Sequence, residues 1–154
     1  MPAVIDKGMN MFKKIMVPVD LAHKDAIEPA VTAASDLARH YGAEVCYVGV
    51  TATTPGSVAR TPEEYQQKLD AFAQQQSQQH HGQAVSARAI TSPDPVVDLN
   101  DVLVKAIKDT GADLVVMATH LPRHLDAVLP AHGGEVATHT DASVFLIRPS
   151  EGKR

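Results

Sequence analysis

The chain has 154 residues, a length that suits one domain with a sizeable core. Its formal net charge of −4 gives no basic footprint for nucleic acid, and 44% hydrophobic content is ordinary for a globular protein. No apolar run is long enough to span a membrane, and residues 1–10 lack the apolar core of a signal peptide. The single cysteine, Cys46, excludes an internal disulfide and fits a reducing compartment. We therefore expect a cytoplasmic protein that binds neither membrane nor nucleic acid.

The first half of the chain predicts a strand, a helix and a second strand. Ile15–Asp20 is short and apolar and ends at an acid, which indicates a buried parallel strand. Between Asp25 and Tyr41, apolar residues recur at three- and four-residue spacing, as on the buried face of a helix. Gly42 stands at the expected C-cap, and Glu44–Val50 is the second strand.

A polar loop over residues 51–60 precedes a helix whose start carries several agreeing signals. Thr61 is suited to cap the helix, Pro62 to occupy its first turn, and Glu64 to complete a capping box. The helix is expected to turn four apolar residues inward: Tyr65, Leu69, Phe72 and Ala73.

The second half predicts three more strands. Ala84–Ile90 indicates a strand at a sheet edge, Thr91–Pro95 a turn, and a helix starts near Asp98 and ends at Gly111. Asp113–Ala118 is the fourth strand. After a loop, a helix over about residues 134–140 leads to the fifth strand, residues 143–148.

This alternation predicts an α/β fold: a Rossmann-like, doubly wound, five-stranded parallel sheet with helices on both faces. We expect one domain over residues 11–149, with a flexible arm at 1–10 and a polar tail at 150–154. Ligands of such sheets lie beyond the carboxyl ends of the strands. The relevant loops start at Val19–Asp20, Val50–Thr51 and Ala118–Thr119.

Three segments resemble the universal stress protein family: Lys14–Asp20, Gly111–His120 and Ala137–Arg148. The resemblance runs from about Phe12 to Arg148. It implies the fold just described and a homodimer in which the fifth strands pair antiparallel. Here that strand is Val144–Ile147, an apolar edge that would otherwise stay open.

Members of the family that bind ATP carry glycine, two residues, glycine, nine residues, then glycine with Ser or Thr. Glycine lets backbone N–H groups approach phosphate oxygens. In this chain the first two glycines map to Ala118 and Leu121. The last pair maps to Ala131–His132, or to Pro130–Ala131 when counted back from the fifth strand. The resemblance therefore favours a protein without tight ATP binding.

The alternative is an ATP- or AMP-binding member with a rebuilt phosphate loop. Some relatives replace the front of the loop by a small residue, Ser or Thr, His, any residue and Pro, and can still bind nucleotide. Ala118–Pro122 fits that variant, and Gly133–Gly134 would offer flexible N–H donors one turn later. Both interpretations stay open at this point.

Several residues form the candidate nucleotide site that the resemblance implies. Asp20 matches an acid near the adenosine, although a helix N-cap explains it equally well. Val50 matches a position whose backbone meets adenine, and a core role suffices for it too. Thr119, His120 and Arg123 could contact ribose or phosphate, or only loop backbone and solvent. The full set is Pro18, Val19, Asp20, Val50, Ala118, Thr119, His120, Arg123, Ala131, His132 and Gly133.

Neither a metal site nor catalysis is expected. His120 and His124 are four residues apart, but Pro122 lies between them and no cysteine or acid cluster joins them. The sequence has no Gly-x-Ser-x-Gly elbow and no Walker lysine. Together with the resemblance, which implies a stress-response homodimer, this predicts a protein that is not an enzyme. It would act by binding or through protein partners that the sequence does not identify.

Overall fold

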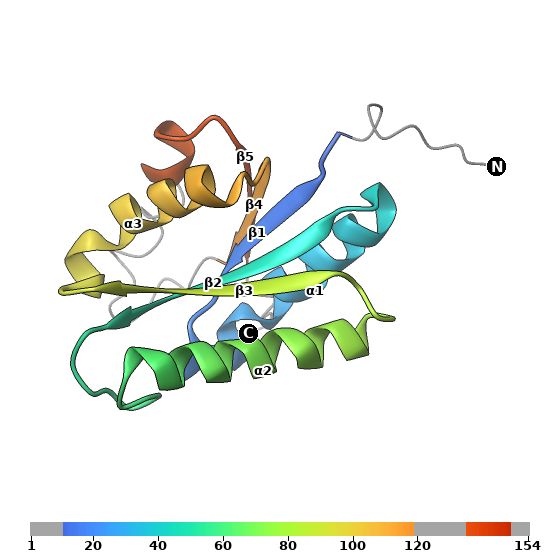
Figure 1. The fold of residues 1–154 in the computed structure, drawn as a ribbon. Helices are drawn as coiled ribbons and strands as arrows, with labels where there is room; N and C mark the ends of the chain where they lie inside the picture. The colour runs from blue at the N-terminus through green and yellow to red at the C-terminus, as the bar shows by residue number, and fades with distance from the viewer. Residues whose placement is uncertain (1–10, 119–134, 149–154) are drawn as a thin grey trace.

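The computed structural model of the protein describes residues 11–118 and 135–148 (Figure 1). Five strands form one sheet in the order β3-β2-β1-β4-β5, and each neighbouring pair is parallel. This confirms the predicted five-stranded Rossmann-like sheet and the edge position of β3. The strands are β1 (Lys14–Pro18), β2 (Glu44–Ala52), β3 (Val85–Ser92), β4 (Leu114–Ala118) and β5 (Ser143–Ile147).

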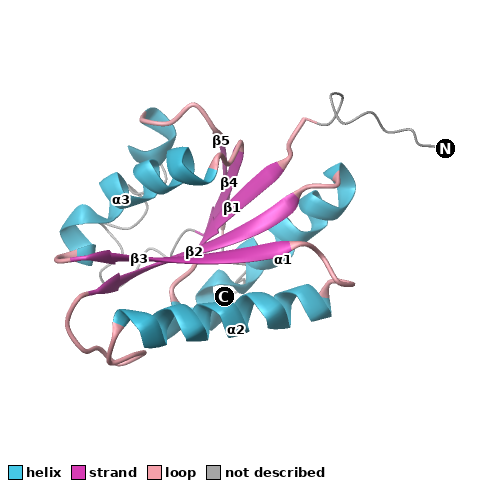
Figure 2. Cartoon of the chain, in the orientation of Figure 1, coloured by secondary structure: helices cyan, strands magenta, loops and turns pink. Residues whose placement is uncertain are grey.

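Helices cover both faces of the sheet (Figure 2). Helices α1 (Lys24–Tyr41) and α2 (Pro62–Gln79) lie on one face, and α3 (Pro95–Thr110) lies on the other together with helical residues 135–138. Strand β2 shows the consequence of alternation: Val45 and Tyr47 pack toward α1 and α2, while Cys46 and Val48 pack toward α3. Within the described residues, no helix is long and apolar enough to cross a membrane.

The predicted helix ends are confirmed, with one difference at α2. Gly42 and Gly111 take the left-handed conformation at the C-caps of α1 and α3, with φ of 69° and 75°. Thr61 accepts from the backbone N–H of Glu64 at 3.0 Å, as an N-cap should. The Glu64 carboxylate does not return to Thr61, however, and instead accepts from the N–H of Arg60 at 2.8 Å. The predicted capping box is therefore only half formed, since the Glu64 carboxylate accepts from the residue before the N-cap and not from the N-cap itself.

Two predicted boundaries were wrong. Strand β1 ends at Pro18, and Asp20 begins a short 3₁₀ helix instead of ending the strand. The predicted turn at Thr91–Pro95 is shorter, because β3 continues to Ser92 and α3 begins at Pro95, not near Asp98. Proline suits the first helical position, since its missing N–H is not needed there. The preceding Asp94 caps the helix by accepting from Val97 N–H at 3.3 Å.

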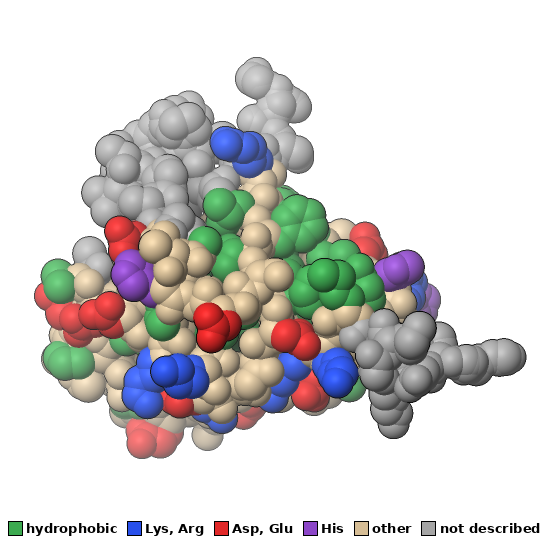
Figure 3. All heavy atoms as spheres, turned by 90° about the horizontal axis from the view of Figure 1, so that it is seen from above, with side chains coloured by type: hydrophobic (Ala, Val, Ile, Leu, Met, Phe, Trp, Pro, Cys, Tyr) green, Lys and Arg blue, Asp and Glu red, His purple; other side chains and the backbone are tan. Residues whose placement is uncertain are grey.

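The last elements agree with the prediction as far as the structure describes them. Residues 135–138 of the predicted helix over 134–140 are helical, and Thr140 is not. At the β5 edge, Phe145 and Leu146 keep 44% and 41% of their surface exposed. Figure 3, seen from above, shows apolar side chains gathered on one part of the surface. The predicted arm and tail lie outside the described residues.

Candidate functional site

The strand order reverses between β1 and β4, so their carboxyl ends mark the expected ligand position. Pro18 and Ala118 are the last residues of these neighbouring strands. Val19 continues past β1 and donates its N–H to Val48 O of β2 at 2.8 Å. This bond holds the segment leaving β1 against β2, and so brings Asp20 toward the end of β2.

Asp20 has a structural role in the described fold. Its carboxylate accepts from the N–H of Ala22 at 3.0 Å and caps the 3₁₀ helix Leu21–His23. The other carboxylate oxygen lies 2.9 Å from Nδ1 of His23. The side chain nevertheless keeps 56% of its surface exposed. The N-cap interpretation is thus confirmed, and the carboxylate still faces solvent where a ligand hydroxyl could reach it.

Tyr65, in the first turn of α2, links the helix to the end of β1. Its side chain is 5% exposed, and its ring lies over Gly49 of β2. A Cβ at position 49 would meet Cε1 and Oη of Tyr65 at 2.7 Å, closer than any relaxed contact. Burial, together with the negative charge of Asp20, raises the pKa of Tyr65 to about 12, against the lowering effect of a hydrogen bond with the Leu21 backbone.

A cavity of about 180 Å³ lies between the end of β1 and the loop that joins β2 to α2. Asp20, Val50 and Tyr65 line it from three separate elements. The remaining wall is the end of β2 and the loop that follows it, which supply mostly small and apolar groups: Thr51, Ala52, Thr54, Pro55, Gly56, Ser57, Val58 and Ala59. A space with apolar walls and one exposed carboxylate suits a small ring with hydroxyl groups attached.

The loop that walls this cavity is fastened to α2. Lys68 donates through Nζ to the carbonyl of Val58, and the N–H of Arg60 donates to Glu64. This bond from Arg60 lowers the pKa of the Glu64 carboxyl. The carboxylate, which is ionised at neutral pH, holds the end of the loop in place. The cavity wall is therefore positioned by the first two turns of a helix.

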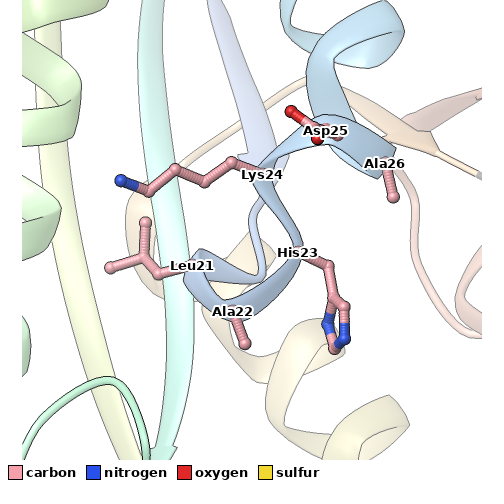
Figure 4. Close-up of a pocket in the computed structure, with 6 residues that line it drawn as sticks. All are labelled: Leu21, Ala22, His23, Lys24, Asp25 and Ala26. Atoms are coloured by element: carbon pink, nitrogen blue, oxygen red, sulfur yellow. The ribbon is translucent and has the colours of Figure 1, made fainter.

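A second hollow, of about 420 Å³, lies at the start of α1 and is lined by residues 21–26 (Figure 4). Figure 4 shows Lys24 and Leu21 extending to one side and His23 to the other, so these side chains do not converge. All the lining residues come from one continuous segment, which leaves the hollow without an opposing wall. It is larger than the cavity at Asp20, but it is less suited to hold a ligand.

The structure brings together part of the predicted site. Asp20 and Val50 line one cavity. Pro18, Val19 and Ala118 lie at the same end of the sheet, where β1 and β4 terminate. Val50 also packs partly against the α3 face of the core. The rest of the predicted site lies outside the described residues: Thr119, His120, Arg123, Ala131, His132 and Gly133.

Tyr65 and Gly49 are the residues that sequence reasoning missed at the site. The sequence predicted Tyr65 as a core residue, which its burial confirms, but not its position against Asp20. A glycine inside a strand is a signal of close approach by another group, and Gly49 carried that signal. Over the described ranges, no group of three His, Cys, Asp or Glu side chains could hold a metal ion.

Comparison with known proteins agrees with this architecture. Among solved structures, a universal stress protein in complex with cAMP has a TM-score of 0.65 at 15% identity, over 90% of this chain and 98% of that one. One from Lactobacillus plantarum has a TM-score of 0.64 at 21% identity, over 88% and 97%. One from Archaeoglobus fulgidus in complex with dAMP has a TM-score of 0.61 at 18% identity, over 89% and 98%.

These identities establish the fold alone. Among curated protein sequences there is no significant match. The sequence profile of the universal stress protein family, in contrast, matches residues 11–148, most of the chain. The protein therefore belongs to the universal stress protein family.

Proposed function

We propose that the protein acts in the stress response by binding, without turnover, and that it holds a ligand of the adenine-nucleotide class without tight recognition of a triphosphate. The observation that carries the ligand class is the cavity at the ends of β1 and β2. Its apolar walls around Val50 would take a planar base, and the exposed Asp20 carboxylate would accept hydrogen bonds from sugar hydroxyls. The cAMP and dAMP complexes of structural neighbours support this class.

The weak triphosphate recognition is supported by the sequence after β4. Neither register places glycine at the three positions that mark ATP binders: Ala118 and Leu121 stand at the first two, and Ala131 or Pro130 at the third. The Asp20 carboxylate would also repel phosphates, which must then point away from the cavity. The β- and γ-phosphates would add little to the affinity.

The test is isothermal titration with adenosine, AMP and ATP, with and without Mg²⁺, after removal of any co-purified nucleotide. We expect AMP and ATP to bind with affinities within about tenfold of each other, a difference below about 1.4 kcal/mol. ATP binding far tighter than AMP would support the alternative of a rebuilt phosphate loop. Absence of heat with all three would overturn the ligand and leave protein partners as the function.

A matched pair of variants tests the cavity. Asp20→Asn should weaken adenosine and AMP binding while the helix cap persists, because asparagine caps helices about as well as aspartate. Asp36→Asn removes one exposed carboxylate on α1, which lies 3.4 Å from Arg39, and should leave binding unchanged. Equal affinity for the Asp20 variant and wild type would place the ligand elsewhere.

We also propose that the protein is a homodimer that pairs through β5. The support is the position of β5 as the last strand of the sheet in the described part of the chain, together with the exposed Phe145 and Leu146. Phe145→Lys should halve the particle mass in sedimentation velocity. Val97→Lys is the control, since Val97 is 75% exposed on α3 and away from that edge. A wild-type protein that sediments as a monomer at micromolar concentration would refute the dimer.

A further inference from the structure

The other edge of the sheet, at β3, is closed by a side chain. Gln66 of α2 donates from Nε2 to the carbonyl of Ala87 at 3.3 Å, and its Oε1 accepts from the N–H of Ala89 at 2.8 Å. Since β2 occupies the inner side of β3, these two groups belong to the outer edge. The carboxamide of Gln66 thus pairs with one carbonyl and one N–H, two residues apart on β3, which are the groups that a neighbouring strand would bond.

The hydrogen-bond partners of the Gln66 carboxamide fix which way its oxygen and its nitrogen face. Nε2 of Gln66 also donates to Oδ1 of Asp70, one helical turn later, at 2.9 Å. Turning the amide around would place its oxygen against both the Asp70 carboxylate and the Ala87 carbonyl, and its NH₂ group against the Ala89 N–H. Every one of these contacts would be repulsive, so the carboxamide is held in the one orientation that matches the edge.

We propose that Gln66 is an edge-closing residue, which keeps the β3 strand of a second copy from pairing with β3. An unpaired strand edge is a template for another chain, and natural proteins block such edges. Here the block sits at the middle of an eight-residue strand, where it interrupts any continuous ladder. The exposed Arg88 lies between the two bonded residues and adds a charge. The two edges therefore differ: β3 is closed by Gln66, whereas β5 is the edge that we propose pairs in the dimer.

The consequence concerns how far assembly can proceed. Pairing at β5 alone gives a closed two-fold dimer, whose two β3 edges face outward. If β3 could also pair with itself, dimers would join into an unlimited sheet. Closure of β3 would make the assembly finite. This inference needs no ligand and does not depend on whether the nucleotide proposal holds.

The test compares Gln66→Leu with Gln67→Leu, a change at the exposed neighbouring position on the same helix. Leucine at position 66 fills a similar volume but can make neither hydrogen bond. Amide hydrogen exchange at Ala89 reads the bond directly, and sedimentation velocity over a range of protein concentrations reads the assembly. In Gln66→Leu we expect Ala89 exchange to accelerate at least about tenfold, in line with the loss of one net hydrogen bond.

We also expect the Gln66→Leu particle mass to grow with concentration, by doublings, while wild type and Gln67→Leu keep one mass. Unchanged exchange at Ala89 would overturn the pairing, and faster exchange with an unchanged mass would overturn the block on assembly. If Gln66→Leu does not fold, wild-type exchange still decides about the bond. Ala89 should then exchange at least about tenfold more slowly than Thr91, whose N–H points the same way by strand alternation; equal rates would refute the pairing.

If wild type is a monomer and the particle mass of Gln66→Leu grows with concentration, then Gln66 closes β3 but β5 does not form a dimer. If wild type is a dimer and the particle mass of Gln66→Leu grows, both the β5 dimer and the closure of β3 are supported. The two proposals can therefore fail separately.

Discussion

The contact between Gly49 and Tyr65 allows a sharp test of how the site is built. In Gly49→Ala, the new Cβ would lie 2.7 Å from Cε1 and Oη of Tyr65, against 3.4–4 Å for an ordinary contact. Tyr65 is 5% exposed and has little room to move aside. Overpacking of this kind costs about 1–3 kcal/mol. Alanine in a strand also recovers about 0.5–1 kcal/mol over glycine, so the net loss should be about 1–2 kcal/mol.

A double-mutant cycle isolates the clash. In a Tyr65→Leu background the aromatic ring is gone, and Gly49→Ala should become neutral or stabilise the protein by up to about 1 kcal/mol. Tyr65→Phe removes Oη but keeps Cε1, so there the penalty should persist. Urea denaturation followed by circular dichroism gives the free energy of unfolding of each variant.

The expected coupling between the two positions is about 2 kcal/mol. A Gly49→Ala cost that is the same in both backgrounds, within about 0.5 kcal/mol, would refute the close approach of ring and strand. A stabilising Gly49→Ala in the wild-type background would refute it as well. Either result would also remove the physical reason for a glycine at this position.

Two further predictions concern the core and the sheet. Burial raises the pKa of Tyr47 to about 12, above the value near 10 of an unfolded chain, so the unfolded chain loses this proton first. The contribution of Tyr47 to the free energy of unfolding is therefore fully present below pH 10. It is lost between pH 10 and 12, where the free energy of unfolding falls by up to about 1.4 kcal/mol per pH unit. In Tyr47→Phe, the free energy of unfolding measured with urea should fall less steeply over this pH range. Tyr41→Phe, at a half-buried position on α1, is the control and should show a steeper fall than Tyr47→Phe.

Asp113→Ala should cost about 1–2 kcal/mol by urea denaturation, because the carboxylate accepts from Lys13 N at 2.9 Å and from Lys14 N at 3.1 Å. Asp109→Ala removes only an exposed pair with Lys105 and should cost less than about 0.5 kcal/mol; equal costs would contradict the role of Asp113.

The sheet could be predicted from local pattern because its strands are apolar runs separated by amphipathic helices. Gly42 and Gly111 ended their helices as expected, since only a residue without a side chain takes φ near 70° at little cost. The wrong boundaries share one cause: short polar segments beside prolines fit both a turn and a helix cap. At Asp94 and Pro95 the cap prevailed, because Asp94 meets the N–H of Val97.

The site was harder to predict, because its geometry depends on contacts across the sheet. Asp20 was equally consistent with a ligand contact and an N-cap, and sequence contains nothing that separates them. The structure adds that its carboxylate has one oxygen on Ala22 N–H, the other near His23, and still more than half of its surface in solvent. Tyr65 reaches this acid only because Gly49 leaves space on β2, a relation between positions 16 residues apart that no local periodicity reports.

Asp113 and the candidate ligand site lie at opposite ends of β4. Asp113 precedes the strand, where its carboxylate binds the backbone leading into β1 and its own backbone bonds Lys14 O and Ser143 N. These bonds tie the starts of β1, β4 and β5 together, which any member of the fold needs whatever it binds. The candidate ligand residues after β4, in contrast, start at Ala118, at the other end. A chain can therefore keep Asp113 and change its ligand, because the bonds of Asp113 serve the fold whereas the residues expected to meet a phosphate follow Ala118.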